Sequence, residues 1–257
     1  MLKRIIQNLI PSPLLKHYKK RQYFEILRSH NPNNEPDLKV VMMLAEPQSI
    51  VLDIGANIGL YAKYLSTVAK QVISFEPVPF TFEMLQNNIK LFQLNNVDAR
   101  QLAISNINGE AKIEVPVQAG VHNFYRASLE QQNPNPNAFK INIETKTLDS
   151  LVIDQVDSIS FIKCDVEGHE LSVIEGANSF LFKSYAAWLI EISSNPDENN
   201  SPASKLISIM NQHGYMIYFY NGKALQKYRK GDKNVNYFFL KKDHLKILEE
   251  KGLDIIE

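Results

Sequence analysis

A glycine loop between an apolar strand and a helix constrains this chain most. Residues 51–60 read Val-Leu-Asp-Ile-Gly-Ala-Asn-Ile-Gly-Leu, and Phe-Glu-Pro follows at residues 75–77, one helix and one strand later. A strand that runs into a glycine loop and a helix, with a carboxylate at the end of the next strand, is typical of a nucleotide-binding α/β fold. The loop spells Asp-x-Gly-x-Asn-x-Gly, which differs from the dinucleotide-binding pattern Gly-x-Gly-x-x-Gly.

The chemistry of this loop favours S-adenosylmethionine (SAM) over a nicotinamide cofactor. Gly55 and Gly59 allow positive φ and let backbone amides approach a ligand. Because ligands of doubly wound sheets bind beyond the carboxyl ends of the strands, Glu76 is placed to accept hydrogen bonds from ribose hydroxyls. Asp53 would repel a pyrophosphate, whereas SAM carries a sulfonium and an ammonium group and no phosphate. Taken one by one, the glycines could form a plain turn and Asp53 could cap the next element.

From Val40 onward, strand and helix patterns alternate, which predicts a doubly wound, mostly parallel sheet. The seven expected strands are residues 50–54, 71–75, 99–104, 158–164, 186–192, 215–220 and 236–241. The helices expected between them are residues 59–68, 79–94, 169–182 and 203–213. Residues 106–147 interrupt the rhythm, and the alternating stretches 111–117 and 139–147 predict an antiparallel insertion. Residues 118–138 between them are rich in Asn, Gln and Pro and are long for a connection in a compact domain.

The N-terminal residues 1–46 are expected to form a helical extension before a catalytic domain at residues 47–257. Within residues 1–30, seven Lys and Arg side chains face one acidic residue, Glu25. This segment could present a basic amphipathic surface to a membrane or an anionic partner. It could equally be a pair of helices, interrupted at Pro11 and Pro13, that pack on the catalytic core and keep a solvated basic side.

Overall composition excludes several classes. With 28 basic and 28 acidic residues, the chain offers no bulk field for nucleic acid. The one cysteine, Cys164, rules out an intrachain disulfide and suits a reducing compartment. No apolar run approaches the roughly 20 residues of a membrane span, and no secretory signal is recognisable. We therefore expect a soluble, cytoplasmic protein.

A second polar cluster ends the strand predicted at residues 158–164. The run Phe-Ile-Lys-Cys-Asp-Val-Glu-Gly-His-Glu at residues 161–170 brings Asp165, Glu167, His169 and Glu170 to the same edge of the sheet as the glycine loop. Burying carboxylates at a strand end is costly unless they are paired or ligand-bound, so the cluster indicates a functional site. Asp165 or Glu167 alone could cap the next helix, and His169 alone could be structural. Lys163 could be either a buried ion-pair partner or a solvent-facing strand residue.

Four motifs together resemble the FkbM family of SAM-dependent methyltransferases. They are Asp-Ile-Gly-Ala-Asn-Ile-Gly at residues 53–59, Phe-Glu-Pro at 75–77, Thr-Leu-Asp at 147–149 and Lys-Cys-Asp-Val-Glu-Gly-His-Glu at 163–170, with Val-Ile-Glu-Gly-Ala trailing at 173–177. The resemblance covers roughly residues 47–241 and implies a Rossmann-like class I methyltransferase fold and methyl transfer from SAM to a hydroxyl, often of a sugar or a polyketide. At Glu191-Ile-Ser193 the chain departs from the family, where a histidine near the serine would be more familiar.

The predicted cofactor-binding residues lie on the glycine loop and on three strand ends: Asp53, Gly55, Asn57, Gly59, Glu76, Pro77, Ala103 and Asp165. For catalysis we expect His169 as the general base, because its intrinsic pKa lies near neutrality, with Glu167 as second choice. Asp165 would face the methionine part of the cofactor or the incoming hydroxyl. A divalent metal held by Asp165, His169 and Glu191 is possible in principle, but the spacing matches no metal signature, so none is expected.

The acceptor is expected to meet residues 118–138, which could fold over the site as a lid. Hydrogen-bonding and aromatic side chains there suit a sugar, and the predicted substrate-binding residues are His122, Tyr125, Arg126 and Glu191. The alternative is a surface loop without contact to substrate. The predicted function is a SAM-dependent O-methyltransferase acting on a sugar or glycan precursor.

Two other functions are weighed against this prediction. A catalytically inactive SAM-fold binding or assembly module is disfavoured by the intact Asp165, Glu167 and His169. A nicotinamide-dependent sugar oxidoreductase is disfavoured by the loop sequence.

Overall fold

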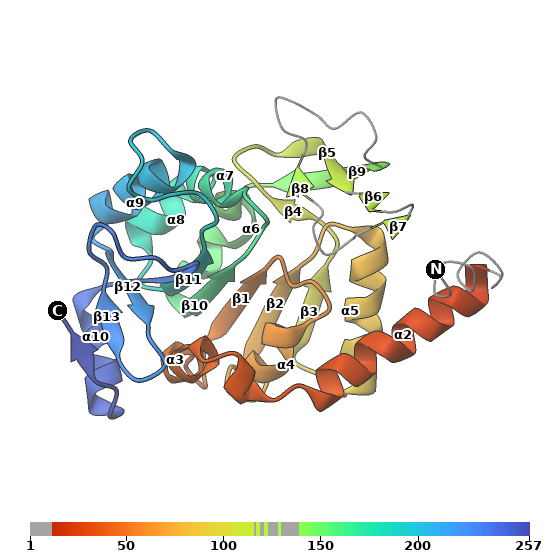
Figure 1. Ribbon diagram of the computed structural model, residues 1–257, viewed down its shortest axis with the longest axis horizontal. Coiled ribbons are helices and arrows are strands. Elements are labelled where there is room, and N and C mark those ends of the chain that lie inside the picture. The colour runs from red at the N-terminus through yellow and green to blue at the C-terminus, as the bar shows by residue number, and fades with distance from the viewer. Residues whose placement is uncertain (1–11, 116, 119–120, 123–127, 130–138) are drawn as a thin grey trace.

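The computed structural model describes residues 12–115, 117–118, 121–122, 128–129 and 139–257, without the side chains of residues 12–16 and 116–139. Its main sheet has the order β15-β13-β12-β14-β11-β10-β1-β2-β3 (Figure 1). In that order the strands are Ile255–Ile256, Leu225–Lys227, Met216–Tyr220, Asn236–Leu240, Ala187–Glu191, Ile159–Cys164, Ile50–Ile54, Gln71–Phe75 and Val97–Arg100. The predicted doubly wound, mostly parallel sheet is confirmed. Two short strands, β13 and β15, extend the seven predicted ones at one edge.

The direction of chain winding reverses at β1. This strand pairs in parallel with β2 on one side and with β10 on the other. Beyond β11 the sheet continues through β14, which is antiparallel to both β11 and β12. Crevices in doubly wound sheets form where the order reverses, at the carboxyl ends of the strands. The ends of β1, β2 and β10 therefore define the place to look for a ligand.

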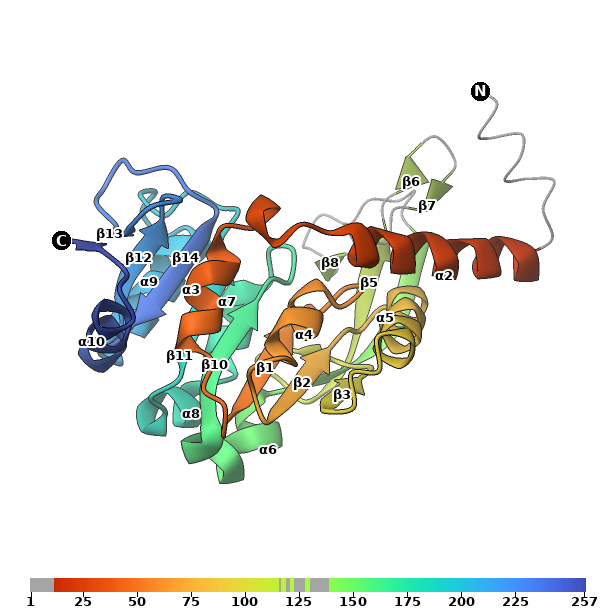
Figure 2. The ribbon, with the colours of Figure 1, turned by 90° about the horizontal axis from the view of Figure 1, so that it is seen from below.

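Helices cover both faces of the main sheet because neighbouring strand residues point to opposite sides (Figure 2). Val51 packs in a core with α3 (Asp37–Leu44), α4 (Leu60–Leu65) and α10 (Lys242–Glu250). Leu52, its neighbour, packs in a second core with α6 (Leu148–Val152), α7 (Glu170–Glu175), α8 (Asn178–Lys183) and α9 (Pro202–Gln212). The sheet is thus buried on both faces, and polar strand residues are usable only at its ends.

The predicted antiparallel insertion is confirmed as a second sheet with the order β4-β9-β5-β8. Its strands are β4 (Ala103–Ile104), β9 (Phe139–Lys146), β5 (Gly109–Val115) and β8 (Ser128–Leu129), and a separate hairpin pairs β6 (Val117–Gln118) with β7 (Val121–His122). Figure 1 shows this sheet above the carboxyl ends of β1, β2 and β3. The insertion therefore forms one wall over the crevice.

Two predicted elements are each divided in the structure. The helix expected at residues 169–182 is split into α7 and α8 at Gly176, where the chain passes so close to Ser105 that a Cβ would lie 2.0 Å from its carbonyl oxygen. The strand expected at residues 99–104 ends in the main sheet at Arg100, and β4 turns away to pair with β9. Both breaks bring the start of the insertion against α7.

The helix α2 (Ser12–Ser29) packs along α5 (Pro79–Leu91) and leads through a 3-10 turn at Pro32–Asn34 into α3. Tyr23 and Leu27 are buried, and Lys20 forms an ion pair of 2.7 Å with Glu83. This matches the alternative of a helix packed on the core, while the apolar stretch at residues 5–10 lies outside the described residues. In the described parts of the chain, no helix is long and apolar enough to cross a bilayer.

Candidate active site

The glycine loop after β1 is held against the ends of two neighbouring strands. The amides of Gly55 and Ala56 donate to the carbonyl oxygen of Phe75, at 3.0 and 2.9 Å. Gly55 has φ +78°, and a Cβ there would lie 1.7 Å from the carbonyl oxygen of Asp165. The loop after β1 and the loop after β10 therefore touch at a point where only glycine fits.

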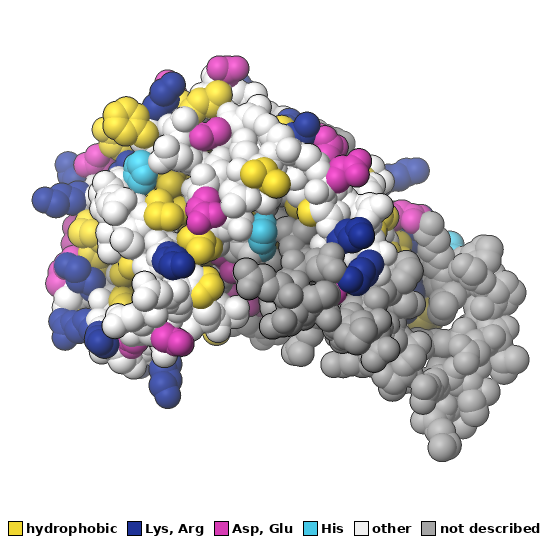
Figure 3. Space-filling view, turned by 90° about the horizontal axis from the view of Figure 1, so that it is seen from above, with side chains coloured by type: hydrophobic (Ala, Val, Ile, Leu, Met, Phe, Trp, Pro, Cys, Tyr) yellow, Lys and Arg dark blue, Asp and Glu magenta, His cyan; other side chains and the backbone are white. Residues whose placement is uncertain are grey.

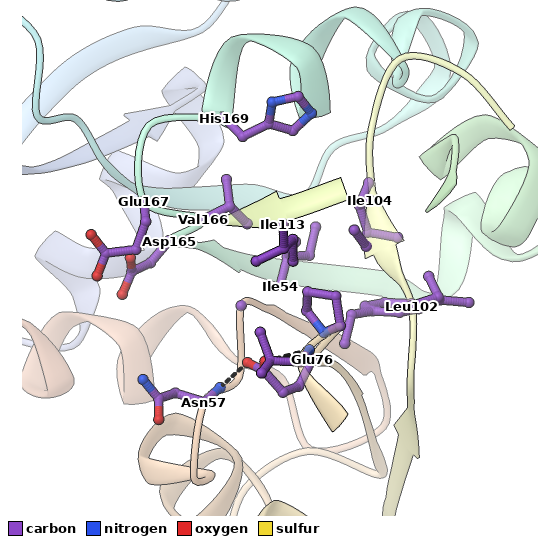
Figure 4. Close-up of a pocket in the computed structure, with 15 residues that line it drawn as sticks. Ile54, Asn57, Glu76, Leu102, Ile104, Ile113, Asp165, Val166, Glu167 and His169 are labelled. Carbon is purple, nitrogen blue, oxygen red and sulfur yellow. Dashed lines mark hydrogen bonds between the residues drawn. The ribbon is translucent and has the colours of Figure 1, made fainter. Parts of the chain in front are cut away.

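Glu76, at the end of β2, fixes the shape of this loop (Figure 4). Its Oε2 accepts from the amide of Asn57 at 3.0 Å, and its Oε1 accepts from the amide of Val78 at 2.9 Å. The side chain is buried, and burial raises its pKa to about 7 although both amides lower it. A carboxylate with four lone-pair positions retains capacity for ligand hydroxyls after accepting two bonds.

Beneath the loop lies a buried charge cluster. Lys163 pairs with Asp165 at 2.9 Å and lies 5.1 Å from the ring centroid of Tyr61. Of the two alternatives left open for Lys163, the structure shows the buried ion-pair partner. Asp53 is fully buried, and neither of its carboxylate oxygens meets a donor with normal hydrogen-bond geometry. Burial raises the pKa of Asp53 to about 6, and Lys163 opposes that rise.

Glu76 and Asp165 border a cavity of about 650 Å³, including its open mouth. Six of the predicted cofactor residues line it: Gly55, Asn57, Glu76, Pro77, Ala103 and Asp165. The other two do not. Gly59 begins α4 and faces Leu85, since a Cβ there would lie 2.7 Å from the Cδ1 of that side chain, and Asp53 lies below the cavity wall.

The cavity fits a cationic nucleoside without phosphate. Ile54, Leu102 and Ile113 supply apolar wall area, as expected around an aromatic base. The amide oxygen of Asn57 is buried without a hydrogen-bond partner, so the site contains polar capacity that the protein itself does not use. Glu76 and Asp165 border the cavity, and Asp53 lies behind it. This acidic lining suits the sulfonium and ammonium groups of SAM.

The loop after β10 carries two of the predicted catalytic residues on one side of the cavity. Figure 4 shows the side chains of Asp165 and Glu167 next to each other, away from Glu76. Glu170, which is buried at the start of α7, shapes this loop: its Oε1 accepts from the amide of Gly168 at 3.0 Å and from that of Val166 at 3.3 Å. Glu167 itself has φ +54°, so the turn that Glu170 stabilises is what directs this side chain outward.

His169 lies on the other side of the cavity, and its ring does not face Asp165 or Glu167 (Figure 4). Its Nε2 lies 3.0 Å from the Oγ of Ser105, at the root of the insertion. Burial lowers the pKa of His169, and Glu175 opposes this only in part, so the site favours the neutral imidazole. Sequence reasoning missed Ser105, because no motif links it to a histidine far along the chain.

The predicted substrate residues fall in two groups. Glu191 ends β11 and is half-buried; burial raises its pKa to about 7, and Asp165 adds to the rise while Lys163 opposes it. Tyr125 and Arg126 lie outside the described residues. His122 belongs to β7, and its side chain is likewise not described.

Two further features bear on the predictions. No group of three or more His, Cys, Asp or Glu side chains is arranged to hold a metal ion in the part of the chain that the structure describes. The Thr-Leu-Asp motif at residues 147–149 has a structural role: Asp149 accepts from the amides of Ser179 and Phe180 at 2.9 and 2.7 Å and so caps α8. That motif lies away from the cavity.

The raised pKa of Glu76 predicts a pH dependence of stability. Its folded value of about 7 exceeds the unfolded value of 4.5, so between these values the folded state binds a proton that the unfolded state has lost. The free energy of unfolding therefore falls as pH rises from 5 to 8. We expect Glu76→Gln to gain stability relative to wild type over this range, on the order of 2 kcal/mol, since one pKa unit corresponds to about 1.4 kcal/mol.

Urea unfolding without ligand at pH 5 and pH 8 measures this difference. Glu110→Gln, at an exposed glutamate of β5, is the matched control and should follow wild type at both pH values. Equal stability differences at both pH values for Glu76→Gln would show that this carboxyl titrates normally.

Comparison with known proteins shows the family to which this chain belongs. Residues 53–217 match the family model described as the Methyltransferase FkbM domain. The chain is 30% identical over 186 residues to the hexuronic acid methyltransferase AglP of Haloferax volcanii, covering 72% of each chain. It is 27% identical to the 2-O-methyltransferase NoeI of Sinorhizobium fredii, covering 63% of this chain and 71% of that protein. A crystal structure of an FkbM methyltransferase from Methylobacillus flagellatus aligns with 76% of this chain and 44% of its own, at 18% identity and a TM-score of 0.49. The chain belongs to the FkbM family of SAM-dependent methyltransferases.

Proposed function

We propose that this protein transfers a methyl group from SAM to a hydroxyl of a sugar or glycan precursor. The observation that carries the proposal is a partly buried imidazole, with a lowered pKa, at the edge of an acidic cofactor cavity. Such an imidazole can accept the proton of a hydroxyl at neutral pH. Two relatives support the acceptor class, since one is named a hexuronic acid methyltransferase and the other a 2-O-methyltransferase.

In this proposal, different cofactor-binding residues contact different parts of SAM. Glu76 accepts the ribose hydroxyls, while its amide contacts keep the loop at Asn57 in place. Asp165 and the buried Asp53 offset the positive charges of the methionine part. Pro77 and Ala103 lie with the apolar wall that receives the base.

SAM supplies an activated methyl group, so the protein has to align the acceptor oxygen, exclude water and remove one proton. His169 is proposed to donate its Nε2 proton to the Oγ of Ser105, which leaves the lone pair on Nδ1. As the acceptor oxygen forms its bond to carbon and the carbon–sulfur bond breaks, the hydroxyl proton moves to Nδ1. Glu191 lies close enough to Asp165 and Glu167 to interact electrostatically with both, and Glu167 and Glu191 are proposed to bind acceptor hydroxyls.

His169→Ala is expected to lower kcat about 10²-fold or more and to change SAM affinity less than threefold, because a base acts on the acceptor and not on the cofactor. Radiolabelled methyl transfer measured from pH 6 to 10 tests this, with calorimetry for SAM. His213→Ala, on the outer end of α9, is the matched control. Near-normal kcat across that pH range would assign proton removal to Glu167 or to solvent.

The proposed function itself is tested by incubating the protein with labelled SAM and a panel of methyl glycosides. A methyl ether on a sugar hydroxyl survives alkaline treatment, whereas a methyl ester on a uronic acid does not. Alkali-stable label on a sugar supports the proposal, and alkali-labile label would show carboxyl methylation instead. Calorimetric binding of NAD but not SAM would indicate an oxidoreductase, and SAM binding without transfer to any glycoside would indicate a binding module.

A further inference from the structure

A second cavity lies directly behind the loop that carries Asp165 and Glu167. It is lined by the start of α7 (Gly168, Glu170, Leu171), the segment after β11 (Ile192, Ser193, Ser194) and the first turns of α9 (Pro202, Ala203, Leu206). These three segments follow strands β10 and β11 or begin the helices above them, so the cavity opens at the same edge of the sheet as the cofactor cavity. In Figure 1, α7 and α9 lie together at this edge.

The two cavities share one wall. Val166, Glu167 and His169 line the cofactor cavity, whereas Gly168 and Glu170, in the same stretch of chain, line the second cavity. Gly168 is exposed, and a Cβ placed on it would meet no atom within 4 Å. A ligand in the second cavity can therefore extend across Gly168 towards the reacting methyl group without displacing a side chain of this loop.

The lining of the second cavity combines an apolar floor with hydrogen-bonding groups. Leu171, Ile192 and Leu206 form the floor, and the exposed Ser193 lies at the rim. Glu170 is only 7% exposed, and both hydrogen bonds that it receives from the loop go to Oε1. Besides these two bonds and one from its own backbone amide, the carboxylate has a further lone-pair position for a ligand hydroxyl. An apolar face with hydroxyl groups at its edges is the chemistry of a pyranose ring.

The charge of the side chains around the second cavity limits the class of ligand that it can bind. Among the residues that the structure describes, no Lys or Arg lines the second cavity, and Glu170 is part of its lining. Glu167 and Glu191 lie close by and interact electrostatically with each other. Figure 3 looks onto this upper face, where hydrophobic, acidic and basic side chains are interspersed. An anionic group would be repelled here, so a carboxylate-bearing ring is excluded from this position.

We propose that this second cavity binds a neutral sugar residue of the acceptor, with Glu170 and Ser193 as its hydrogen-bonding partners. This assignment rests on the proposed function. It places acceptor recognition on the segments after β10 and β11, in addition to the predicted insertion residues. Neither Ser193 nor the start of α9 was predicted from the sequence as a substrate contact.

Ser193→Phe tests the assignment, because a phenyl ring at the exposed rim closes the mouth without entering the core. Ser208→Phe is the matched control, since it places the same ring on an exposed position of α9 that does not line the cavity. The acceptors are methyl glucopyranoside, methyl rhamnopyranoside and methyl glucuronoside, assayed with labelled SAM. Calorimetry with SAM reports whether the cofactor cavity is intact in each variant.

We expect Ser193→Phe to lower kcat/KM for the neutral glycosides at least tenfold, mainly through KM, with SAM affinity within twofold of wild type. Ser208→Phe should match wild type in both, and wild type should prefer the neutral glycosides to the glucuronoside. Equal kcat/KM in the two phenylalanine variants would overturn the cavity assignment and leave the proposed function standing. A preference of wild type for the glucuronoside would overturn the neutral class. Transfer by wild type to none of the three would remove the proposed function and the assignment with it.

Discussion

Replacing Glu76 by alanine is expected to weaken SAM binding at least about 100-fold while the protein stays folded. The carboxylate holds the amides of Asn57 and Val78 and is the proposed acceptor for the ribose hydroxyls. Hydrogen bonds to charged groups contribute about 1.5–3 kcal/mol each, so the loss of two from the ligand corresponds to about two orders of magnitude or more. Because the carboxyl is buried with a raised pKa, its removal does not cost the unliganded fold a favourable charge.

Calorimetry at pH 8, where Glu76 is ionised, measures the effect. Glu76→Gln keeps the shape and one acceptor oxygen and should lose less affinity than the alanine variant. Glu110→Ala, at an exposed glutamate, should bind as wild type. Unchanged affinity in a folded Glu76→Ala protein would remove Glu76 from the ribose site.

Gly55→Ala is expected to have the largest effect on folding. The new Cβ would lie 1.7 Å from the carbonyl oxygen of Asp165, and φ is +78°, so steric overlap and backbone strain act together. The loops after β1 and β10 would have to separate, which opens the cofactor cavity between them. We expect a loss of more than about 3 kcal/mol in unfolding free energy, since strain of this kind alone costs about 1–3 kcal/mol, together with loss of measurable SAM binding.

Substitutions at two other glycines measure backbone strain and steric overlap separately. Gly214 has φ +81° with no atom within 4 Å of an added Cβ, so Gly214→Ala reports strain alone. At Gly176 the φ is −82°, and the added Cβ would lie 2.0 Å from the Ser105 carbonyl oxygen, so Gly176→Ala reports overlap alone. Denaturant unfolding of the three variants should rank Gly55→Ala as the least stable. A Gly55→Ala protein as stable as Gly214→Ala would mean that the two loops are not in contact.

The parts of the site that follow from local sequence were predictable. The loop at residues 53–59 and the carboxylate of Glu76 each follow a buried strand, and parallel strands bring such ends to one edge of the sheet. The alternating stretches around residues 106–147 likewise predict their own pairing, which the ladder between β5 and β9 confirms.

What could not be predicted depends on contacts between distant segments. Lys163 was ambiguous because strand periodicity does not reveal whether a central strand is covered on both faces; in the structure it is buried beside Asp165. The close approach of Gly176 to Ser105 joins segments far apart in the chain, which no local pattern reveals. The second cavity is assembled from three separate segments, so no single motif could indicate it.

The hydrogen bonds of Ser105 and Asn106 to the two ends of α7 limit which parts of the insertion can change in sequence. Ser105 contacts His169 before the helix, and Asn106 donates to Glu175 at its last residue, at 3.0 Å. A six-residue helix has little stability of its own, so its orientation is inherited from these contacts. Ser105 is in turn bonded to Lys146, where the insertion returns to the main domain. Residues at the far end of the insertion can therefore change to suit a new acceptor without moving the imidazole of His169. A shift of one residue in the register at residues 105 and 106 would instead reorient α7 and the imidazole together.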